Sequence, residues 1–399
     1  MTSVDLPHTP PESVVVIGAS AAGLATVTKL RRDGYEGKVT LLGEEAHAPY
    51  DRPPLSKKFL TGAWEPEKLA LASSDQLTDL NTDIRLSTRV AAMDIKRGLV
   101  VDDTGLEYPY EAAVIATGVR PRPLPAVSTG TPHVLRTISD ARRLKDCLRA
   151  GKRLLIVGAG FLGLEAAGTA VRLGAHVTVV ETALFPLSSR LGITTSNRLL
   201  ALHGTNGIDL RLGVAVEDAR IANSNVWTVD LSDGETIEAD EVLVAIGSIP
   251  VTEWLDGSGV DIDNGVVCDS SCQAVPGVWA AGDVARWWDV RHEKHIRTEH
   301  RTNATEQAQF VASAILGKKR SYVPVPFFWT DQYDVRIQVA GHIPEGAVEE
   351  VLESGSHEDS TISLFHKDGT LTGVLGWNAP REVSKYRREL LAQNKVWES

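Results

Sequence analysis

The sequence predicts an α/β fold in which two Rossmann-like domains are followed by a small α+β domain at the C-terminus. Three features predict it: a glycine-rich loop at residues 18–23, a second at residues 158–163, and short alternating segments after about residue 322. Each loop follows a short apolar run and precedes a helical pattern, the setting in which such glycines bind phosphate. We therefore expect two bound dinucleotides, each with its pyrophosphate on the amides of a helix N-terminus.

The composition is that of a globular protein with a large core. The chain has 399 residues, 43% of them apolar, and a formal charge of −11. This acidic balance argues against general nucleic-acid binding, which needs Lys and Arg to neutralise phosphates. Residues 1–12 are interpreted as a flexible tail without a signal region, and no apolar run approaches the ~20 residues that span a bilayer. We expect a cytoplasmic protein that contacts no membrane.

The three cysteines are Cys147, Cys268 and Cys272, and the sequence shows no CxxC pair and no Cys/His ligand cluster around them. The pattern therefore predicts neither a disulfide framework nor a metal site. We interpret the three side chains as ordinary core or surface thiols.

The first unit starts a doubly wound sheet with a strand, a helix and a second strand, at residues 14–17, 24–32 and 38–42. Adjacent prolines in the segment Tyr50 to Lys57 exclude a helix or central strand there, and we expect a helix to begin at Ser56. After a strand at residues 113–116, residues 117–123 are expected to form an exit loop.

The second unit repeats this plan with a strand, a helix and a strand at residues 154–157, 164–173 and 176–180. Its exit, residues 243–250, resembles residues 114–121, so the two units are an internal duplication. A later strand at residues 278–281 indicates that the chain then returns to the first unit. The expected divisions are a tail (1–12), a discontinuous first domain (13–120 and 251–324), a second domain (121–250) and a C-terminal domain (325–399).

The C-terminal domain is expected to contain antiparallel strands, because short segments of alternating character follow one another at residues 335–340, 363–366 and 371–375. A helix over residues 381–393 closes the chain.

The first loop offers Gly18, Ser20, Ala22 and Gly23 to a dinucleotide, with Ser20 in place of the usual middle glycine. Serine is still small enough to let a pyrophosphate approach. Glu44 follows the second strand, where a carboxylate can accept hydrogen bonds from an adenosine ribose. The alternative, that Glu44 and its neighbour Glu45 are solvated loop acids, stays open.

The second loop keeps all three glycines and is the stronger of the two. Its expected nucleotide-binding residues are Gly158, Gly160, Phe161, Leu162 and Gly163. Glu181 closes the following strand and would repel a 2′-phosphate, which favours NAD(H) over NADP(H), although Arg190 nearby opposes that preference. Glu165 lies in the first helical turn, where a carboxylate can also simply complement the helix dipole.

Several motifs occur in order along the chain and carry a family resemblance. They are Arg52 to Lys57, Ala116 to Gly118, Gly158 to Glu165, Ala281 to Val284, Glu299-His300, and Phe328 to Gln332. Together they resemble the FAD-dependent, NADH-linked ferredoxin reductases of oxygenase systems, the family of putidaredoxin reductase and biphenyl dioxygenase ferredoxin reductase. The resemblance implies a glutathione-reductase-like arrangement of the two Rossmann-like domains.

The resemblance implies FAD at the first loop and NADH at the second. It places these further residues around FAD: Glu44, Arg52, Lys57, Val90, Ala116, Arg122, Asp283, Glu299, His300 and Trp329. It adds Glu165, Glu181, Arg190 and Gly247 around NADH. Lys57 and Glu165 would approach each other near the flavin and nicotinamide and act by positioning and electrostatics. For Trp329 the alternative is an ordinary core aromatic.

The implied activity is hydride transfer from NADH to FAD, followed by single-electron transfer to a 2Fe–2S ferredoxin that feeds a monooxygenase or dioxygenase. Acidic ferredoxins could dock on a local basic face built from Arg301, Lys385, Arg387 and Arg388. Arg301 stands where the family often has tryptophan. The alternative for the C-terminal cluster is a solvated basic helix face.

Other classes of protein share part of this pattern. Disulfide reductases share the two-dinucleotide plan but need a cysteine pair that the first domain's early helix lacks. Rubredoxin reductase, monodehydroascorbate reductase and NADH oxidase differ only in the electron acceptor. Proteins like the apoptosis-inducing factor keep both dinucleotide sites but act largely by binding.

Overall fold

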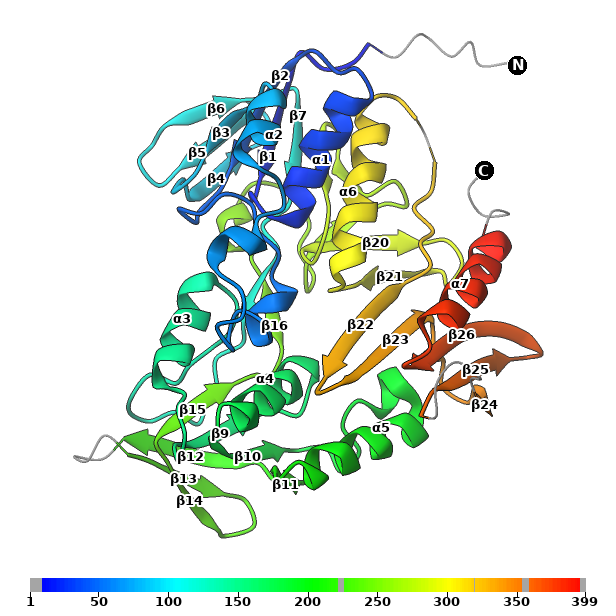
Figure 1. Cartoon of the computed structure of the whole chain (residues 1–399). Helices are drawn as coiled ribbons and strands as arrows, with labels where there is room; N and C mark the ends of the chain where they lie inside the picture. The colour runs from blue at the N-terminus through cyan, green and yellow to red at the C-terminus, as the bar shows by residue number, and fades with distance from the viewer. Residues whose placement is uncertain (1–8, 222–225, 319, 354–358, 395–399) are drawn as a thin grey trace.

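The structure is a computed structural model, and it describes residues 9–221, 226–318, 320–353 and 359–394 (Figure 1). Residues 1–8 of the expected tail lie outside this range. Among the described residues, no helix is both long enough and apolar enough to cross a bilayer.

The first sheet is built around β1 (Ser13–Ile17), whose Val-Val-Val-Ile run is almost completely buried. Its strand order is β18-β19-β7-β1-β2-β3. The partners are β2 (Lys38–Leu42), β3 (Asp83–Arg85), β7 (Ala112–Ile115), β18 (Gln273–Val275) and β19 (Val278–Ala280). β19 lies parallel to β7, so the chain does return to this sheet after the second unit. The residue limits of the domains stay a prediction.

Helices α1 (Ala21–Arg32), α2 (Ser74–Asp79) and α6 (Arg301–Ile315) and two small sheets belong to the first unit as well. α1 and α6 pack side by side, although most of the chain separates them (Figure 1). One small sheet contains β4 (Val90–Asp94), β5 (Leu99–Asp102) and β6 (Glu107–Pro109). The other contains β17 (Val266–Cys268), β20 (Ala285–Asp289) and β21 (Lys294–Arg297). The short helix α2 begins with a capping box formed by Ser73 and Gln76.

The second unit has a four-stranded parallel sheet in the order β11-β10-β9-β15. Its strands are β9 (Arg153–Val157), β10 (His176–Glu181), β11 (Asp209–Leu212) and β15 (Glu241–Val244). Its helices are α3 (Ile138–Cys147), α4 (Phe161–Arg172) and α5 (Ser188–Thr205). A three-stranded antiparallel sheet is added by β12 (Val216–Ile221), β13 (Trp227–Leu231) and β14 (Thr236–Ala239).

The two glycine loops repeat one another at atomic detail. A Cβ on Gly23 would lie 2.0 Å from the carbonyl oxygen of Gly18, and one on Gly163 would lie 2.1 Å from that of Gly158. Such distances exclude any side chain, since helix and strand meet backbone to backbone there. The duplication inferred from the sequence therefore extends to the packing of each loop.

Two local expectations were wrong. Pro53–Ser56 form a 3₁₀ helix, so Ser56 ends a short helix where the sequence suggested that one begins. Prolines are tolerated there because the first helical turn does not need their missing N–H groups. In addition, the expected exit loop contains β8 (Val119–Pro121), which pairs antiparallel with β16 (Ser248–Pro250) of the other exit. Each of these two short strands forms because the other lies beside it, and local sequence alone does not show this pairing.

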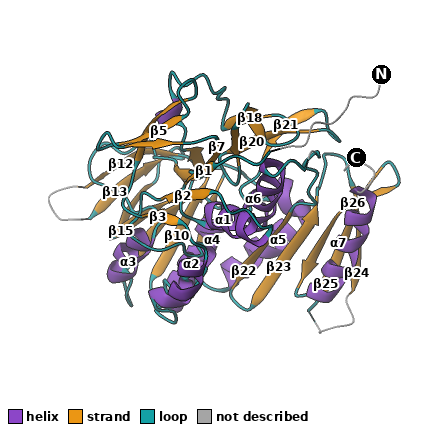
Figure 2. Ribbon diagram, turned by 90° about the horizontal axis from the view of Figure 1, so that it is seen from above, coloured by secondary structure: helices purple, strands orange, loops and turns teal. Residues whose placement is uncertain are grey.

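The C-terminal domain is an antiparallel sheet in the order β22-β23-β26-β25-β24, with α7 (Pro380–Asn394) packed on β26 and β23 (Figures 1 and 2). The strands are β22 (Phe327–Gln332), β23 (Val335–Gly341), β24 (Val348–Glu353), β25 (Thr361–Lys367) and β26 (Thr370–Trp377). This α+β arrangement confirms the predicted class, and it brings β22 against α4 and α6.

Candidate functional site

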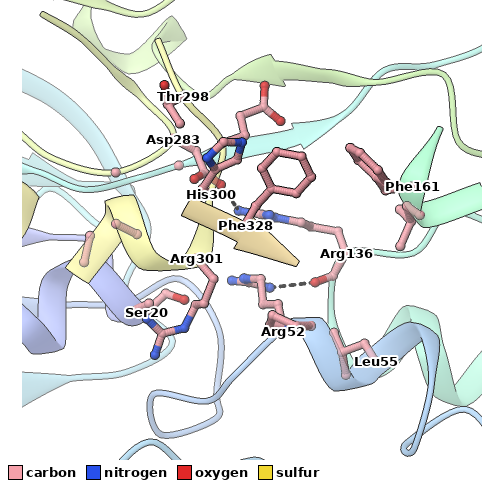
Figure 3. A pocket seen from close by; sticks show the side chains of 18 of the residues that line it. Ser20, Arg52, Leu55, Arg136, Phe161, Asp283, Thr298, His300, Arg301 and Phe328 are labelled. Carbon is pink, nitrogen blue, oxygen red and sulfur yellow. Dashed lines mark hydrogen bonds and ion pairs between the residues drawn. The ribbon is translucent and has the colours of Figure 1, made fainter. Parts of the chain in front are cut away.

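A cleft of about 550 Å³ lies where the two units and β22 meet. The N-termini of α1, α4 and α6 border it, together with the 3₁₀ helix Pro53–Ser56 (Figure 3). The expected site residues that line it are Ser20, Ala22, Arg52, Lys57, Ala116, Phe161, Leu162, Glu165, Arg190, Asp283, Glu299, His300, Arg301 and Trp329. Residues from many segments that are far apart in the sequence thus share one cavity wall.

At the first loop, Ser20 is the N-cap of α1, and its side chain makes no capping hydrogen bond. The first-turn amides of α1 are therefore left for another acceptor, at the end of the helix where the dipole favours negative charge. Gly18 and Gly23 lie behind this surface and allow the close approach of helix and strand rather than lining the cleft.

The second loop presents Gly160 as the N-cap of α4, and a Cβ there would meet no atom of the described residues within 4 Å. The Glu181 carboxylate accepts a hydrogen bond of 2.8 Å from the backbone N–H of Ala159, so the acid lies beside the loop. Gly158, Gly163 and Gly247 do not line the main cleft. The arrangement leaves an open approach to the N-terminus of α4.

Lys57 and Glu165 meet at the cleft wall, with 2.6 Å between Nζ and Oε2. Glu165 extends from the first turn of α4, and Lys57 follows the 3₁₀ helix of the other unit. Ser56 Oγ donates to the same carboxylate oxygen at 2.7 Å, while Thr330 Oγ1 donates to the other oxygen at 2.7 Å. The pair is mostly buried, so its charges are weakly screened.

A second charged group surrounds Asp283. Burial raises the pKa of the Asp283 carboxyl, although Arg136 Nη2 lies 3.5 Å from Oδ2 and opposes the effect. Burial also lowers the pKa of the Arg136 guanidinium, with a further contribution from the neighbouring charge of Arg52. Arg52 donates to Glu45 at 2.7 Å and to the Arg136 carbonyl at 2.7 Å (Figure 3). Two largely buried guanidinium groups, of Arg52 and Arg136, thus lie at this end of the cleft, each beside a carboxylate.

Two buried nitrogens face this region without a hydrogen-bond partner among the described residues: His300 Nδ1 and Arg297 Nε. Burial lowers the pKa of His300 to about 4, so its ring is neutral at physiological pH. Its ring centroid lies 4.8 Å from that of Phe328, which is 5.1 Å from Phe161 (Figure 3). Unpaired buried polar atoms beside an aromatic wall fit a large, partly polar planar ligand.

Besides the glycines of the two loops and Glu181, four expected site residues do not line the cleft. Glu44 is exposed, with Arg89 3.6 Å away, whereas its neighbour Glu45 faces Arg52. Val90 is a buried core residue at the start of β4, and Arg122 is exposed and donates to the Ser248 carbonyl. Gly247 directly precedes β16 and has a positive φ of +99°.

The sequence did not identify several residues that line the cleft. They are Tyr50, Leu135, Arg136, Arg297, Thr298 and Phe328. Arg136 stands one residue before Thr137, the N-cap of α3, and that capping box was the only local signal near it. Phe328 belonged to a recognised motif without an assigned role, and Tyr50 belonged only to the proline-containing segment before Lys57.

Only part of the expected basic face has charges that are not paired with a carboxylate. Arg301 pairs with Asp51, and Arg387 pairs with Glu306 at 2.7 Å while its guanidinium covers the Phe327 ring. Lys385 and Arg388 are exposed on α7. Two of the four cations are therefore neutralised by neighbours.

The structure also gathers three possible ligands that the sequence keeps apart. His133, Cys147 and Glu241 place their ligand atoms within 4.8 Å of one another. His133 Nε2 lies 2.8 Å from Glu241 Oε2, and burial raises the pKa of the Cys147 thiol. No spacing motif in the sequence marks this cluster, because 108 positions separate His133 from Glu241.

Two Rossmann-like sheets, one glycine loop on each and a cleft between them define a class of oxidoreductases that bind two dinucleotides. The chain belongs to the pyridine nucleotide-disulphide oxidoreductase family, whose model matches residues 12–308. A Reductase C-terminal model matches residues 327–398. Its relatives are ferredoxin reductases of oxygenase systems.

Among these relatives, rhodocoxin reductase of Rhodococcus erythropolis is 34% identical, over 96% of this chain and 90% of its own length. Putidaredoxin reductase CamA of Pseudomonas putida is 33% identical, over 90% and 86%. The structure also resembles the covalent putidaredoxin reductase–putidaredoxin complex, with a TM-score of 0.89 and 32% identity over 94% of this chain and 92% of that one. The family resemblance inferred from the motifs is confirmed.

Proposed function

We propose that this protein is an FAD-dependent ferredoxin–NAD⁺ reductase, which takes a hydride from NADH and passes single electrons to a 2Fe–2S ferredoxin of an oxygenase system. The observation that carries the proposal is the shared cleft, in which the Lys57–Glu165 pair lies between the two dinucleotide loops. The relatives named above support the same activity. We further propose that it works in the cytoplasm, where NADH is supplied.

The residues around the first loop fit FAD. The α1 amides beside Ser20 and the positive charge of Arg52 and Arg136 suit a pyrophosphate, while the unpaired His300 Nδ1 and Arg297 Nε suit polar atoms of the ligand. Trp329 and Phe328 supply aromatic surface at the same wall. When bound, FAD supplies an acceptor that takes two electrons together and releases them one at a time.

We assign NADH to the second loop. Gly160 leaves room for a pyrophosphate at the N-terminus of α4, and Glu181 beside the loop disfavours a 2′-phosphate. Lys57 and Glu165 would then orient the nicotinamide end and hold fixed charges beside it. The protein needs no nucleophile for this reaction, since hydride transfer is the chemistry of the cofactors. The roles first expected for Glu44, Val90, Arg122, Arg190 and Gly247 stay proposals.

Gly160→Ala is expected to weaken NADH binding without disturbing the fold. Gly160 has φ −71°, which alanine adopts easily, and its Cβ would enter free space among the described residues. The added methyl would instead lie where the pyrophosphate approaches, so we expect the KM for NADH to rise about tenfold. Steady-state kinetics and thermal unfolding check this, and an unchanged KM would contradict the assignment of this loop.

For ferredoxin docking we propose the exposed pair Lys385 and Arg388 on α7, with Arg301 and Arg387 in supporting roles because their charges are already paired. Such charges at the rim of an interface mainly increase the association rate with an acidic partner.

Reversing Lys385 and Arg388 together to Glu should raise the KM for an acidic ferredoxin several-fold at low salt and leave ferricyanide reduction unchanged. The matched control reverses Arg142 and Arg149, two exposed cations near α3 on the other side of the molecule (Figure 1). Equal loss with both acceptors, or an equal effect of the control, would refute this docking face.

The activity is tested by cytochrome c reduction with NADH and NADPH, each with and without candidate ferredoxins. We expect fast turnover only with NADH plus a 2Fe–2S ferredoxin. Turnover with rubredoxin or monodehydroascorbate in place of ferredoxin would identify a related reductase. Slow reduction that leaves a long-lived charge-transfer complex would favour a binding role like that of the apoptosis-inducing factor.

A further inference from the structure

A row of buried polar side chains connects the C-terminal domain to the Lys57–Glu165 pair. We propose that Thr330 and Gln332 of β22 are positioning residues that hold the Glu165 carboxylate in the orientation needed for hydride transfer. This inference rests on the proposed function. It assigns to the C-terminal domain a role in the NADH half of the reaction, in addition to any part in docking a ferredoxin.

The hydrogen bonds in this row have a fixed direction. Gln332 Nε2 donates to Thr330 Oγ1 at 2.8 Å, and Thr330 Oγ1 lies 2.7 Å from Glu165 Oε1. A carboxylate can only accept, so the Thr330 hydroxyl proton must point toward Glu165. Thr330 and Gln332 are 0% and 1% exposed, which leaves water no access to replace either bond. The row therefore acts as a rigid donor aimed at one oxygen of Glu165.

The far end of the row lies in α5 of the second unit. Gln332 Oε1 and His203 Nε2 are both buried, and neither has a hydrogen-bond partner among the described residues. Burial lowers the pKa of His203 to about 4, against the smaller raising effect of a hydrogen bond with Gln332. Nδ1 of the neutral ring can accept from the Tyr333 hydroxyl, 3.3 Å away, which leaves the ring proton on Nε2. A neutral His203 therefore places no charge beside Gln332.

The other oxygen of Glu165 is held from the first unit. Oε2 accepts from Lys57 Nζ at 2.6 Å and from Ser56 Oγ at 2.7 Å, and Thr169 Oγ1 in turn holds the Ser56 carbonyl at 2.8 Å. Glu165 is thus fixed at both oxygens, one from each side. Without Thr330 the carboxylate could rotate about its last bond, and Lys57 would lose its fixed partner at the cleft.

The test compares Thr330→Val, which keeps the shape but removes the hydroxyl, with Thr330→Ser, which keeps the hydroxyl. In stopped-flow measurements we expect the rate of flavin reduction by NADH to fall about tenfold in Thr330→Val and to recover to within about twofold in Thr330→Ser. Oxidation of the dithionite-reduced enzyme by ferricyanide should be unchanged in both. Ser360→Ala, which removes another buried hydroxyl of the C-terminal domain, is the control and should leave NADH reduction unchanged.

A crystal structure of Thr330→Val provides a readout that does not depend on activity. We expect the Glu165 carboxylate to turn and the Lys57–Glu165 contact to lengthen beyond hydrogen-bond distance. The inference is overturned if the contact stays intact, if serine fails to rescue a stably folded protein, or if Ser360→Ala slows NADH reduction equally. Failure of the wild-type protein to be reduced by NADH would instead refute the proposed function.

Discussion

Glu165→Gln is expected to slow flavin reduction by NADH about 100-fold, the largest kinetic effect of any single substitution considered for this protein. The substitution keeps the size of the side chain but removes the charge that fixes Lys57 2.6 Å away. A largely buried ammonium would be left without its counter-ion, which is costly and moves Lys57 out of position. Anaerobic stopped-flow absorbance at the flavin band measures the effect directly.

Asp33→Asn is a matched control for this substitution. Asp33 forms an ion pair of equal length with Lys29, at similar exposure, but at the C-terminal end of α1 and away from the cleft. We expect Asp33→Asn to leave NADH reduction unchanged while both variants remain folded. If Glu165→Gln reduced the flavin at the wild-type rate, the Lys57–Glu165 pair would have no part in the reaction.

Gly23→Ala should yield a protein that no longer retains FAD, whereas Gly163→Ala should retain FAD and lose NADH binding. In each case the new Cβ would lie about 2 Å from a backbone carbonyl oxygen, so the loop itself must shift. Overpacking of this kind costs about 1–3 kcal/mol, and the larger value corresponds to an affinity roughly 100-fold weaker. The flavin absorbance of purified protein and NAD⁺ titration measure the two affinities separately.

The pair of glycine variants tests which loop holds which dinucleotide. Retention of FAD by Gly23→Ala together with its loss from Gly163→Ala would reverse the assignment. Gly160→Ala serves as the control for FAD retention, which it should leave unchanged, because its methyl meets no protein atom among the described residues.

The sequence predicted the parts of the fold that local pattern determines. Both glycine loops, their buried strands and the helices after them depend on short apolar runs and on glycines at fixed spacing, so their positions were predicted within a few residues. Local signals failed where the partner comes from elsewhere. β8 and β16 are each too short and proline-rich to be recognised alone, and each is a strand because the other lies beside it.

Local sequence signals also failed to show which residues meet in the cleft. Lys57 and Glu165 are 108 residues apart, and only the family resemblance suggested that they meet. Arg136 lay in no motif, and Thr330 lay in one without an assigned role, because burial and tertiary contacts, which a single sequence does not display, define their function. The ribose-binding role expected of Glu44 stays a proposal: the structure places Glu44 3.6 Å from Arg89, whereas Glu45 faces Arg52.

The most direct test of the central claim is an anaerobic stopped-flow experiment on the FAD-loaded protein with a 2Fe–2S ferredoxin. We expect NADH, and much less NADPH, to bleach the flavin within one fast phase, followed by reduction of two ferredoxin molecules for each NADH consumed, since each cluster takes one electron. Flavin reduction without any electron transfer to 2Fe–2S ferredoxins, or equal rates with NADPH, would contradict the account.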